Sequence, residues 1–232
     1  MTDPRPCPPR PLRADAVRNR ERVLCAAREL FAQRGLDVTM DDVARHAGLG
    51  VGTVYRRFAD REALVEELFG ERLQLTADLA RRCLADPDPW HGLVGLLLAC
   101  CEELAGDKGL RQVMLSSAYG QDRLATARQE LVPLVVQLVA RAQAAGAVRP
   151  DVEPADVPVL FLLVGTVAEF TSCVAPQAWR RTFQLLLDGL RPAQHPEAVP
   201  LRAGLTLAEL DVAMADYRPA APLRGVRAAP PA

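Results

Sequence analysis

Three helix starts are crowded into residues 38–68, and this crowding limits the possible folds more than any other feature of the sequence. Thr39, followed three positions later by Asp42, has the spacing of a capping box, which predicts a helix start. Residues 48–50 read Gly-Leu-Gly and allow a tight reversal, because glycine can adopt the left-handed conformation. Asp60 is the expected cap of the next helix. The sequence therefore predicts short helices joined by a tight turn.

A helix of two turns is expected after the reversal, with one buried face and one exposed face. Val54 and Phe58 are spaced so that both side chains point back to the core. The major groove of B-DNA admits one α-helix, whose exposed early residues can reach phosphates or base edges. The pattern therefore favours a helix-turn-helix that binds DNA, although a plain helical hairpin with solvated Tyr and Arg side chains is the alternative. The exposed side chains would be those of Thr53, Tyr55, Arg56 and Arg57.

Two residues of this segment are unfavourable for stability alone. An exposed glycine inside a helix, such as Gly52, costs about 1 kcal/mol relative to alanine, but it lets another surface approach the backbone closely. Arg61 places a cation in the first turn of a helix, where it opposes the positive end of the helix dipole. A contact with a DNA phosphate would explain both residues.

The segment resembles the helix-turn-helix of the TetR family of bacterial regulators. The matching residues are Phe31, Gly35, Thr39, Val43, Ala44, Ala47, Gly48, Gly52, Thr53, Tyr55, Phe58, Glu62 and Leu64. By this resemblance, the DNA backbone would be contacted mostly by Thr39, Thr53, Tyr55 and Arg61. The resemblance places Gly52 and Arg56 nearest the bases.

Two residues depart from the family pattern. Gly50 stands where the family often has a capping Ser or Thr, so a hydroxyl that could bond a phosphate is missing. Arg56 stands where His is common, and it could make a bidentate contact with guanine that contributes about 1–3 kcal/mol of discrimination. For Arg45 and Arg57, a solvated surface position explains the residue as well as a phosphate contact does. The candidate DNA-binding residues are Thr39, Arg45, Gly50, Gly52, Thr53, Tyr55, Arg56, Arg57 and Arg61.

Helical periodicity dominates the rest of the chain, and no stretch alternates apolar and polar β-branched residues, so we expect an all-α fold. Pro133 should kink or split its helix, and Pro154 and Pro176 should open two others. Thr206 and Glu209 have capping-box spacing and predict a short helix with inward-facing Leu207, Leu210 and Met214. Outside the helix-turn-helix, the longer expected helices cover residues 15–34, 61–84, 90–105, 110–119, 121–145, 154–174 and 176–190.

The expected domain organisation follows from these helices and from the resemblance. A disordered N-terminal arm (1–13) precedes a three-helix DNA-binding domain (14–70). A helical bundle (71–192) would bind the effector and dimerise, and a C-terminal extension (193–232) would contain one short helix and a Pro/Ala-rich tail.

Composition and residue spacing mainly exclude classes of protein. A formal net charge of −1 gives no bulk electrostatic reason to expect nucleic-acid or membrane binding. The longest apolar run, residues 157–168, is shorter than the roughly 20 residues that a membrane-spanning helix needs. Six cysteines without a Cys-x-x-Cys spacing predict reduced thiols and a cytoplasmic protein. His46, His91 and His195 have no metal-site spacing, and no phosphate loop or nucleophile elbow is present, so no metal, cofactor or enzyme activity is expected.

The helices over 154–174 and 176–190 are expected to join two copies of the chain. The first is apolar almost all the way round, and the second carries a stripe that includes Trp179 and Phe183. In the family that this chain resembles, the last two core helices form a four-helix bundle across a two-fold axis. This implies a homodimer and a palindromic operator.

The resemblance also implies a small-molecule effector among the middle helices. Glu169 interrupts an apolar helix, where an unpaired carboxylate is costly, so it should pair with Arg123, another basic group or a cationic ligand. The expected function is a repressor that releases DNA when the effector binds. An activator, a regulator that answers to a protein partner and a small helical enzyme or ligand-binding protein that reuses the fold are the alternatives. The candidate effector-binding residues, for each of which plain core is the simpler interpretation, are Trp90, Cys100, Met114, Tyr119, Phe161, Glu169 and Phe170.

Overall fold

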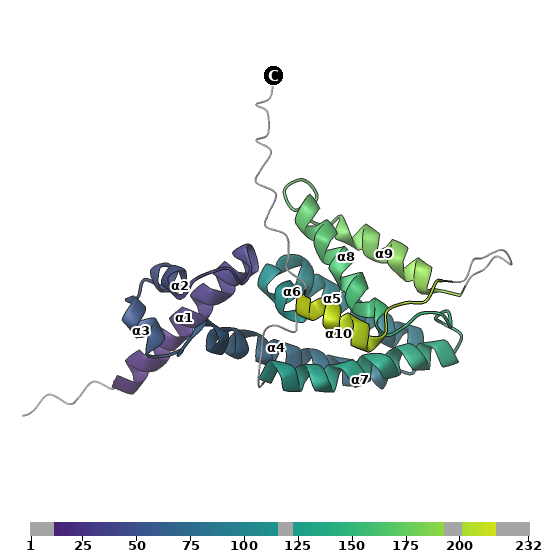
Figure 1. Ribbon diagram of the computed structural model, residues 1–232, viewed down its shortest axis with the longest axis horizontal. Helices are drawn as coiled ribbons and strands as arrows, with labels where there is room; N and C mark the ends of the chain where they lie inside the picture. The colour runs from purple at the N-terminus through teal and green to yellow at the C-terminus, as the bar shows by residue number, and fades with distance from the viewer. Residues whose placement is uncertain (1–11, 116–122, 193–200, 217–232) are drawn as a thin grey trace, which may run out of the picture.

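The computed structural model describes residues 12–115, 123–192 and 201–216, and every regular element in these ranges is a helix, as the sequence predicts. Figure 1 shows α1–α3 grouped at one end of the molecule and α4 running from this group into the remaining helices. We call α1–α3 the head and α5–α9 the body. The helices are α1 (Leu12–Arg34), α2 (Met40–Ala47), α3 (Val51–Tyr55), α4 (Arg61–Leu84), α5 (Pro89–Gly106), α6 (Lys108–Met114), α7 (Arg123–Ala144), α8 (Asp156–Thr171), α9 (Trp179–Leu190) and α10 (Leu207–Asp216).

The first helix starts earlier than the sequence predicts and ends where it predicts. It begins at Leu12, inside the expected disordered arm, and the remainder of that arm lies outside the described residues. Gly35 follows its last turn with a φ of 75° and donates its N–H to the carbonyl oxygen of Phe31 at 2.8 Å. A residue with a side chain is strained at this φ, so glycine is the favoured stop.

Side-chain caps start the next helices at the predicted positions. Thr39 accepts the N–H of Asp42 at 3.1 Å, and Asp42 accepts the N–H of Thr39 at 3.2 Å, so the capping box at the start of α2 is confirmed. Gly48 ends α2 in the left-handed conformation, with a φ of 63°. The Asp60 carboxylate accepts the N–H of Ala63 at 2.8 Å and starts α4. Local interactions thus define the start of α2, the end of α2 at the reversal and the start of α4.

The third helix, α3, is shorter than the two turns predicted. The N–H groups of Arg57 and Phe58 both donate to the carbonyl oxygen of Val54, at 2.8 and 2.9 Å. These bonds close the helix and turn the chain so that Phe58 enters the core. Val54 and Phe58 are buried, as the spacing predicts.

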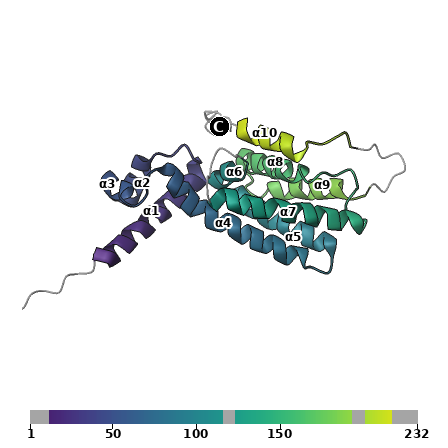
Figure 2. The same cartoon turned by 60° about the horizontal axis from the view of Figure 1, so that its bottom comes forward.

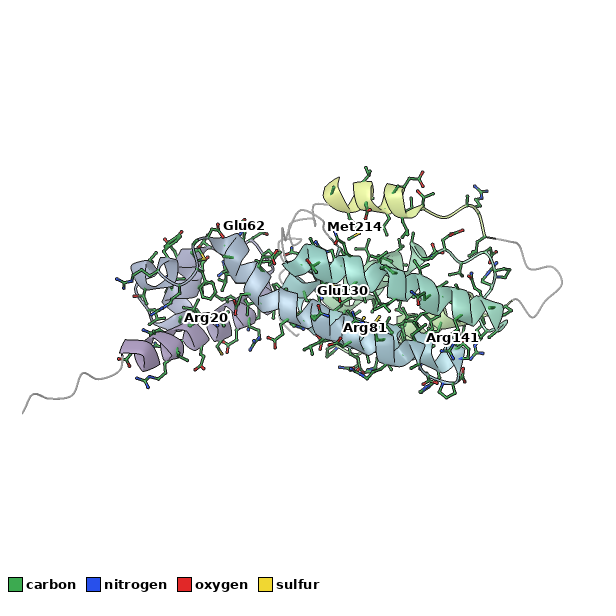
Figure 3. All side chains as sticks on the ribbon, turned by 90° about the horizontal axis from the view of Figure 1, so that it is seen from below. Arg20, Glu62, Arg81, Glu130, Arg141 and Met214 are labelled. Carbon is green, nitrogen blue, oxygen red and sulfur yellow. The ribbon has the colours of Figure 1, made fainter. Side chains whose placement is uncertain are left out.

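The body and α4 together form a bundle, in which α4 packs on α5 and α7, α5 packs on α8, and α8 packs on α9. An ion pair between Arg81 and Glu130, 2.6 Å apart, joins α4 to α7, and Figure 3 shows the two side chains between these helices. Arg141 on α7 donates to the carbonyl oxygen of Leu84 at 2.7 Å and holds the end of α4. α7 continues through Pro133 without the split considered from the sequence, because packing along α4 supports the helix on both sides of the proline.

Both α8 and α9 begin later than the sequence predicts. Pro154 and Pro176 lie in the turns before these helices rather than in their first turns. Before α8, the N–H of Glu153 donates to the side chain of Asp156 at 2.9 Å, and this local turn delays the helix start. Prolines in both places thus precede the helices instead of opening them.

The burial of α8 and α9 differs from the expectation in a way that matters for assembly. α8 is not buried on most sides, because Leu163 and Phe170 are exposed, the latter by 85% of its surface. On α9, Trp179 and Phe183 are buried within the body of the same chain and cannot also face a second subunit. The outer faces of the two helices therefore carry apolar side chains that this chain leaves exposed.

The C-terminal helix α10 starts at a second predicted capping box. The Thr206 hydroxyl donates to Glu209 at 2.8 Å and accepts the Glu209 N–H at 3.2 Å. Leu210 is buried, and Met214 is half-buried and points from α10 toward the body in Figure 3. Leu207 is exposed, contrary to the prediction, because the helix rests on the body at Leu210, beyond its first residue. Figure 2 shows α10 on the opposite side of the body from α4 and α5.

Candidate DNA interface and ligand groove

The short helix α3 presents an exposed polar surface at the end of the head. Tyr55 is exposed over 49% of its surface, Arg56 and Arg57 are exposed, and Thr53 is half-buried. The Arg56 guanidinium donates to the Thr53 hydroxyl at 3.1 Å, so these two side chains share one face of α3. The predicted outward orientation of these residues is confirmed.

Two glycines leave open space beside this surface. A Cβ atom built on Gly50 or on Gly52 would meet no other atom of the chain within 4 Å. Packing within this protein therefore does not require glycine at either position. Gly50 caps α3 without a side-chain hydrogen bond, as its missing hydroxyl predicts. The open space would let another surface approach the backbone of α3 closely.

Thr39, the N-cap of α2, and Arg45, within α2, are both held by one carboxylate. Asp42 accepts the Thr39 hydroxyl at 2.9 Å and forms an ion pair with Arg45 at 3.2 Å. The hydrogen bond from the Thr39 side chain is the main reason that the pKa of Asp42 is lowered below its ordinary value. Asp42 therefore stays ionised at neutral pH and keeps the capping box closed.

Arg61 has a structural role that sequence reasoning missed. Its guanidinium donates to the carbonyl oxygen of Leu36 at 2.6 Å and lies 3.6 Å from the carboxylate of Glu62. These contacts offset the unfavourable position of a cation at a helix N-terminus. A phosphate contact is therefore not needed to explain why arginine occurs here.

A second arginine missed by sequence reasoning positions the helix-turn-helix. Arg22 on α1 donates to the carbonyl oxygens of Ala47 and Gly48, at 2.7 and 3.2 Å. These carbonyls stand at the C-terminal end of α2, where backbone acceptors lack helical partners. Arg22 thus ties the turn before α3 to α1, and no local pattern in the sequence indicates this contact.

A groove of about 490 Å³ lies between α4, α5 and α6. Cys100 and Met114, two of the predicted effector-binding residues, line it. Burial raises the pKa of the Cys100 thiol to about 12, so this side chain stays protonated and acts as a small apolar group. The full lining is Arg72, Leu75, Thr76, Leu79, Arg82, Ala99, Cys100, Glu102, Glu103, Leu104, Leu110 and Met114.

The structure does not bring the other predicted effector-binding residues to this groove. Trp90 is half-buried and lies under the Arg191 guanidinium, 3.9 Å from the ring centre. Phe161 is part of the core, and Phe170 is exposed on the surface. Tyr119 lies outside the described residues, and α6 ends at Met114, before the predicted end at residue 119.

Glu169 is paired with basic groups of the protein, as its position in an apolar helix predicts. Its carboxylate is about half-exposed and lies 3.1 Å from Lys108 and 3.2 Å from Arg111. Both of these partners are cations of α6, whereas the side chain of Arg123, the partner named from the sequence, lies outside the described residues. The pair of contacts joins α6 to α8 and removes the need for a cationic ligand.

The described residues contain no group of three or more His, Cys, Asp or Glu side chains that could hold a metal ion. Among the helices in the described ranges, none combines the length and the apolar character needed to cross a bilayer.

Comparison with known proteins agrees with this arrangement. The family model described as bacterial regulatory proteins of the tetR family matches residues 23–68. A second model, for the C-terminal domain of SbtR-like transcriptional regulators, matches residues 88–192. Together the two models cover the head from residue 23 onward, the start of α4 and the whole of the body.

Individual relatives point the same way. An HTH-type transcriptional regulator of Mycobacterium tuberculosis is 33% identical over 132 residues, which cover 55% of this chain and 68% of the relative. The HTH-type transcriptional repressor BepR of Brucella suis is 28% identical over 153 residues, covering 58% of this chain and 70% of BepR. A TetR transcriptional regulator of Streptomyces coelicolor, known from its crystal structure, is 30% identical to this chain, and the two structures superpose with a TM-score of 0.50. The alignment covers 75% of this chain and 99% of that regulator. The chain therefore belongs to the TetR family of bacterial transcriptional regulators, and its N-terminal helix-turn-helix is a DNA-binding domain of that family.

Proposed function

We propose that this protein is a dimeric repressor that holds a palindromic operator through its two α3 helices and releases it when a small molecule occupies the groove between α4, α5 and α6. The observation that carries the DNA-binding part is the surface of α3. Tyr55 and Arg56 project there beside Gly52, where nothing in the chain occupies the space a side chain would fill. An exposed helix of this kind fits a major groove. The similarity to the repressor BepR supports repression rather than activation of transcription.

The case for a homodimer comes from apolar side chains that the chain leaves uncovered. Phe170, Val174 and Leu185 are largely exposed on the outer side of α8, α9 and the turn between them, and Leu163 is about half-exposed. Large apolar surfaces left in water mark interaction sites. A symmetric dimer through these faces would place two copies of α3 on one side of a DNA duplex.

The case for an effector rests on the composition of the groove. Leu75, Leu79, Leu104, Leu110 and Met114 supply apolar walls, and arginine and glutamate side chains stand at its edges. Apolar walls with a few polar groups are typical of small-molecule sites. Since coupling between two sites is reciprocal, bound operator should weaken effector binding by the same factor by which effector weakens operator binding.

The proposed function is tested with the full-length protein and the duplex that lies upstream of its own coding sequence. A mobility-shift titration should show tight binding that weakens steeply between about 50 and 200 mM salt, because phosphate contacts release counterions. A random-sequence duplex of equal length is the control. Equal affinity for both duplexes, or no binding to either, would contradict the proposal.

Replacing Phe170 with alanine should weaken the dimer by about tenfold or more, because a large exposed aromatic side chain within an apolar surface is a typical hot spot. Sedimentation equilibrium of the wild type and the variant measures the dissociation constant of the dimer. Val17→Ala, at an exposed position on α1, is the control and should leave it unchanged. An F170A dimer as tight as the wild type would show that the subunits meet elsewhere.

A further inference from the structure

The backbone of Leu36, directly after the glycine that ends α1, is held from two sides. Its N–H donates to the side-chain oxygen of Gln112 at 2.5 Å, and its carbonyl oxygen accepts from Arg61 at 2.6 Å. Gln112 lies on α6, and Arg61 is the first residue of α4. The turn between α1 and α2 is therefore fixed by side chains from two helices outside the head.

The packing of α6 against the end of α1 is close around this contact. A Cβ atom on Gly35 would lie 2.5 Å from the Gln112 oxygen, and one on Gly109 would lie 2.9 Å from the Cβ atom of Phe31. Only glycine permits such an approach of α6 to α1. Figures 1 and 2 both show α6 beside the C-terminal end of α1. Gln112 itself is 7% exposed, which is unusual for an amide side chain.

The position of this contact gives it mechanical importance. α4 passes from the head into the body as one helix, so a head attached only through α4 could twist or tilt relative to the body. The contact between α1 and α6 is a second attachment away from the axis of α4 and restricts this motion. Two neighbours of Gln112 on α6 face other parts of the body. Met114 lines the groove, and Arg111 forms an ion pair with Glu169 of α8.

We propose that Gln112 is a positioning residue for DNA recognition: its hydrogen bond to Leu36 sets the orientation of the head, and thereby the separation of the two α3 helices in the dimer. This inference rests on the proposed dimeric DNA-binding function. Each base pair added between two half-sites moves them apart by about 3.4 Å and rotates them by about 35° around the duplex. A firmly held head should therefore bind one half-site spacing much more tightly than others. A loosened head should bind operators of different spacing with more similar affinities.

The test begins with operators selected from a pool of random duplexes by the full-length wild-type protein. Affinities are then measured for the selected spacing and for the same operator with one base pair inserted between its half-sites. Gln112→Met keeps the length of the side chain but lacks the oxygen acceptor, whereas Gln112→Glu retains an acceptor. Val113→Ala is the matched control, because it removes fully buried methyl groups from the next residue of α6 without touching the hydrogen bond.

The ratio of the two affinities should fall by about tenfold in Q112M, since loss of a buried hydrogen bond changes an equilibrium by about this factor. Q112E and V113A should keep the ratio of the wild type, and all variants should keep its half-site sequence preference. An unchanged ratio in Q112M, or an equal reduction in V113A, would overturn the inference and leave DNA binding intact. A wild-type protein that selects no duplex would instead contradict the proposed function and, with it, this inference.

Discussion

Replacing Arg56 with alanine is expected to remove a base preference from each operator half-site. A bidentate contact between arginine and guanine contributes about 1–3 kcal/mol, so the loss over two half-sites amounts to about 2–6 kcal/mol of operator affinity. The fold should remain intact, because Arg56 is exposed and its hydrogen bond within the protein is to the exposed edge of Thr53. Selection from random duplexes with each protein, followed by titration of the selected sequences, measures both the preference and the affinity.

The neighbouring residue supplies the control for this substitution. Arg57 carries the same charge and is also exposed, but it lies one position beyond Arg56, the C-cap of α3. Arg57→Ala should lower the affinity for all duplexes to a similar extent, or leave it unchanged, without altering the preferred bases. If R56A selects the same bases as the wild type, Arg56 does not read the sequence.

Replacing Phe31 with alanine is expected to lower the free energy of unfolding by about 3–5 kcal/mol, the usual loss when a buried phenylalanine is truncated. Phe31 is fully buried, its ring centre lies 6.2 Å from that of Phe69, and its Cβ faces Gly109. The cavity would therefore open where α1, α4 and α6 meet. Since natural domains are stable by about 5–15 kcal/mol, much of the protein would be unfolded at moderate urea concentrations.

Urea denaturation followed by circular dichroism measures this change in the free energy of unfolding. Val17→Ala removes apolar atoms from the same helix at an exposed position and should change it by less than about 0.5 kcal/mol. A loss below about 1 kcal/mol in F31A would contradict the tight packing of the head on α6.

The parts of this structure that the sequence predicted well depend on neighbours along the chain. The two capping boxes, Thr39 with Asp42 and Thr206 with Glu209, each join residues three positions apart. The burial of Val54 and Phe58 follows from helical spacing in the same way. The sequence did not predict contacts that join different helices, such as the hydrogen bond between Leu36 and Gln112.

The two candidate sites also differ in how well the sequence predicted them. The exposed face of α3 was predictable, because the periodicity of a short segment determines which side chains point outward. The groove was only partly predictable: Cys100 and Met114 line it, whereas Phe161 is core and Phe170 lies on the surface. An apolar residue in a helix reveals that it will be covered, but it does not reveal which helix or ligand will cover it.

By itself, the sequence determined the helical fold class, the caps, the tight turn and the family, because each is encoded by residues within a few positions of one another or in one ordered motif. Only the tertiary structure decided which distant groups meet. Arg22 holds Ala47, Gln112 holds Leu36, and Lys108 and Arg111 pair with Glu169. These contacts span 25 to 76 positions along the chain. They form only when helices pack at particular angles, and those angles depend on the shapes of many side chains at once.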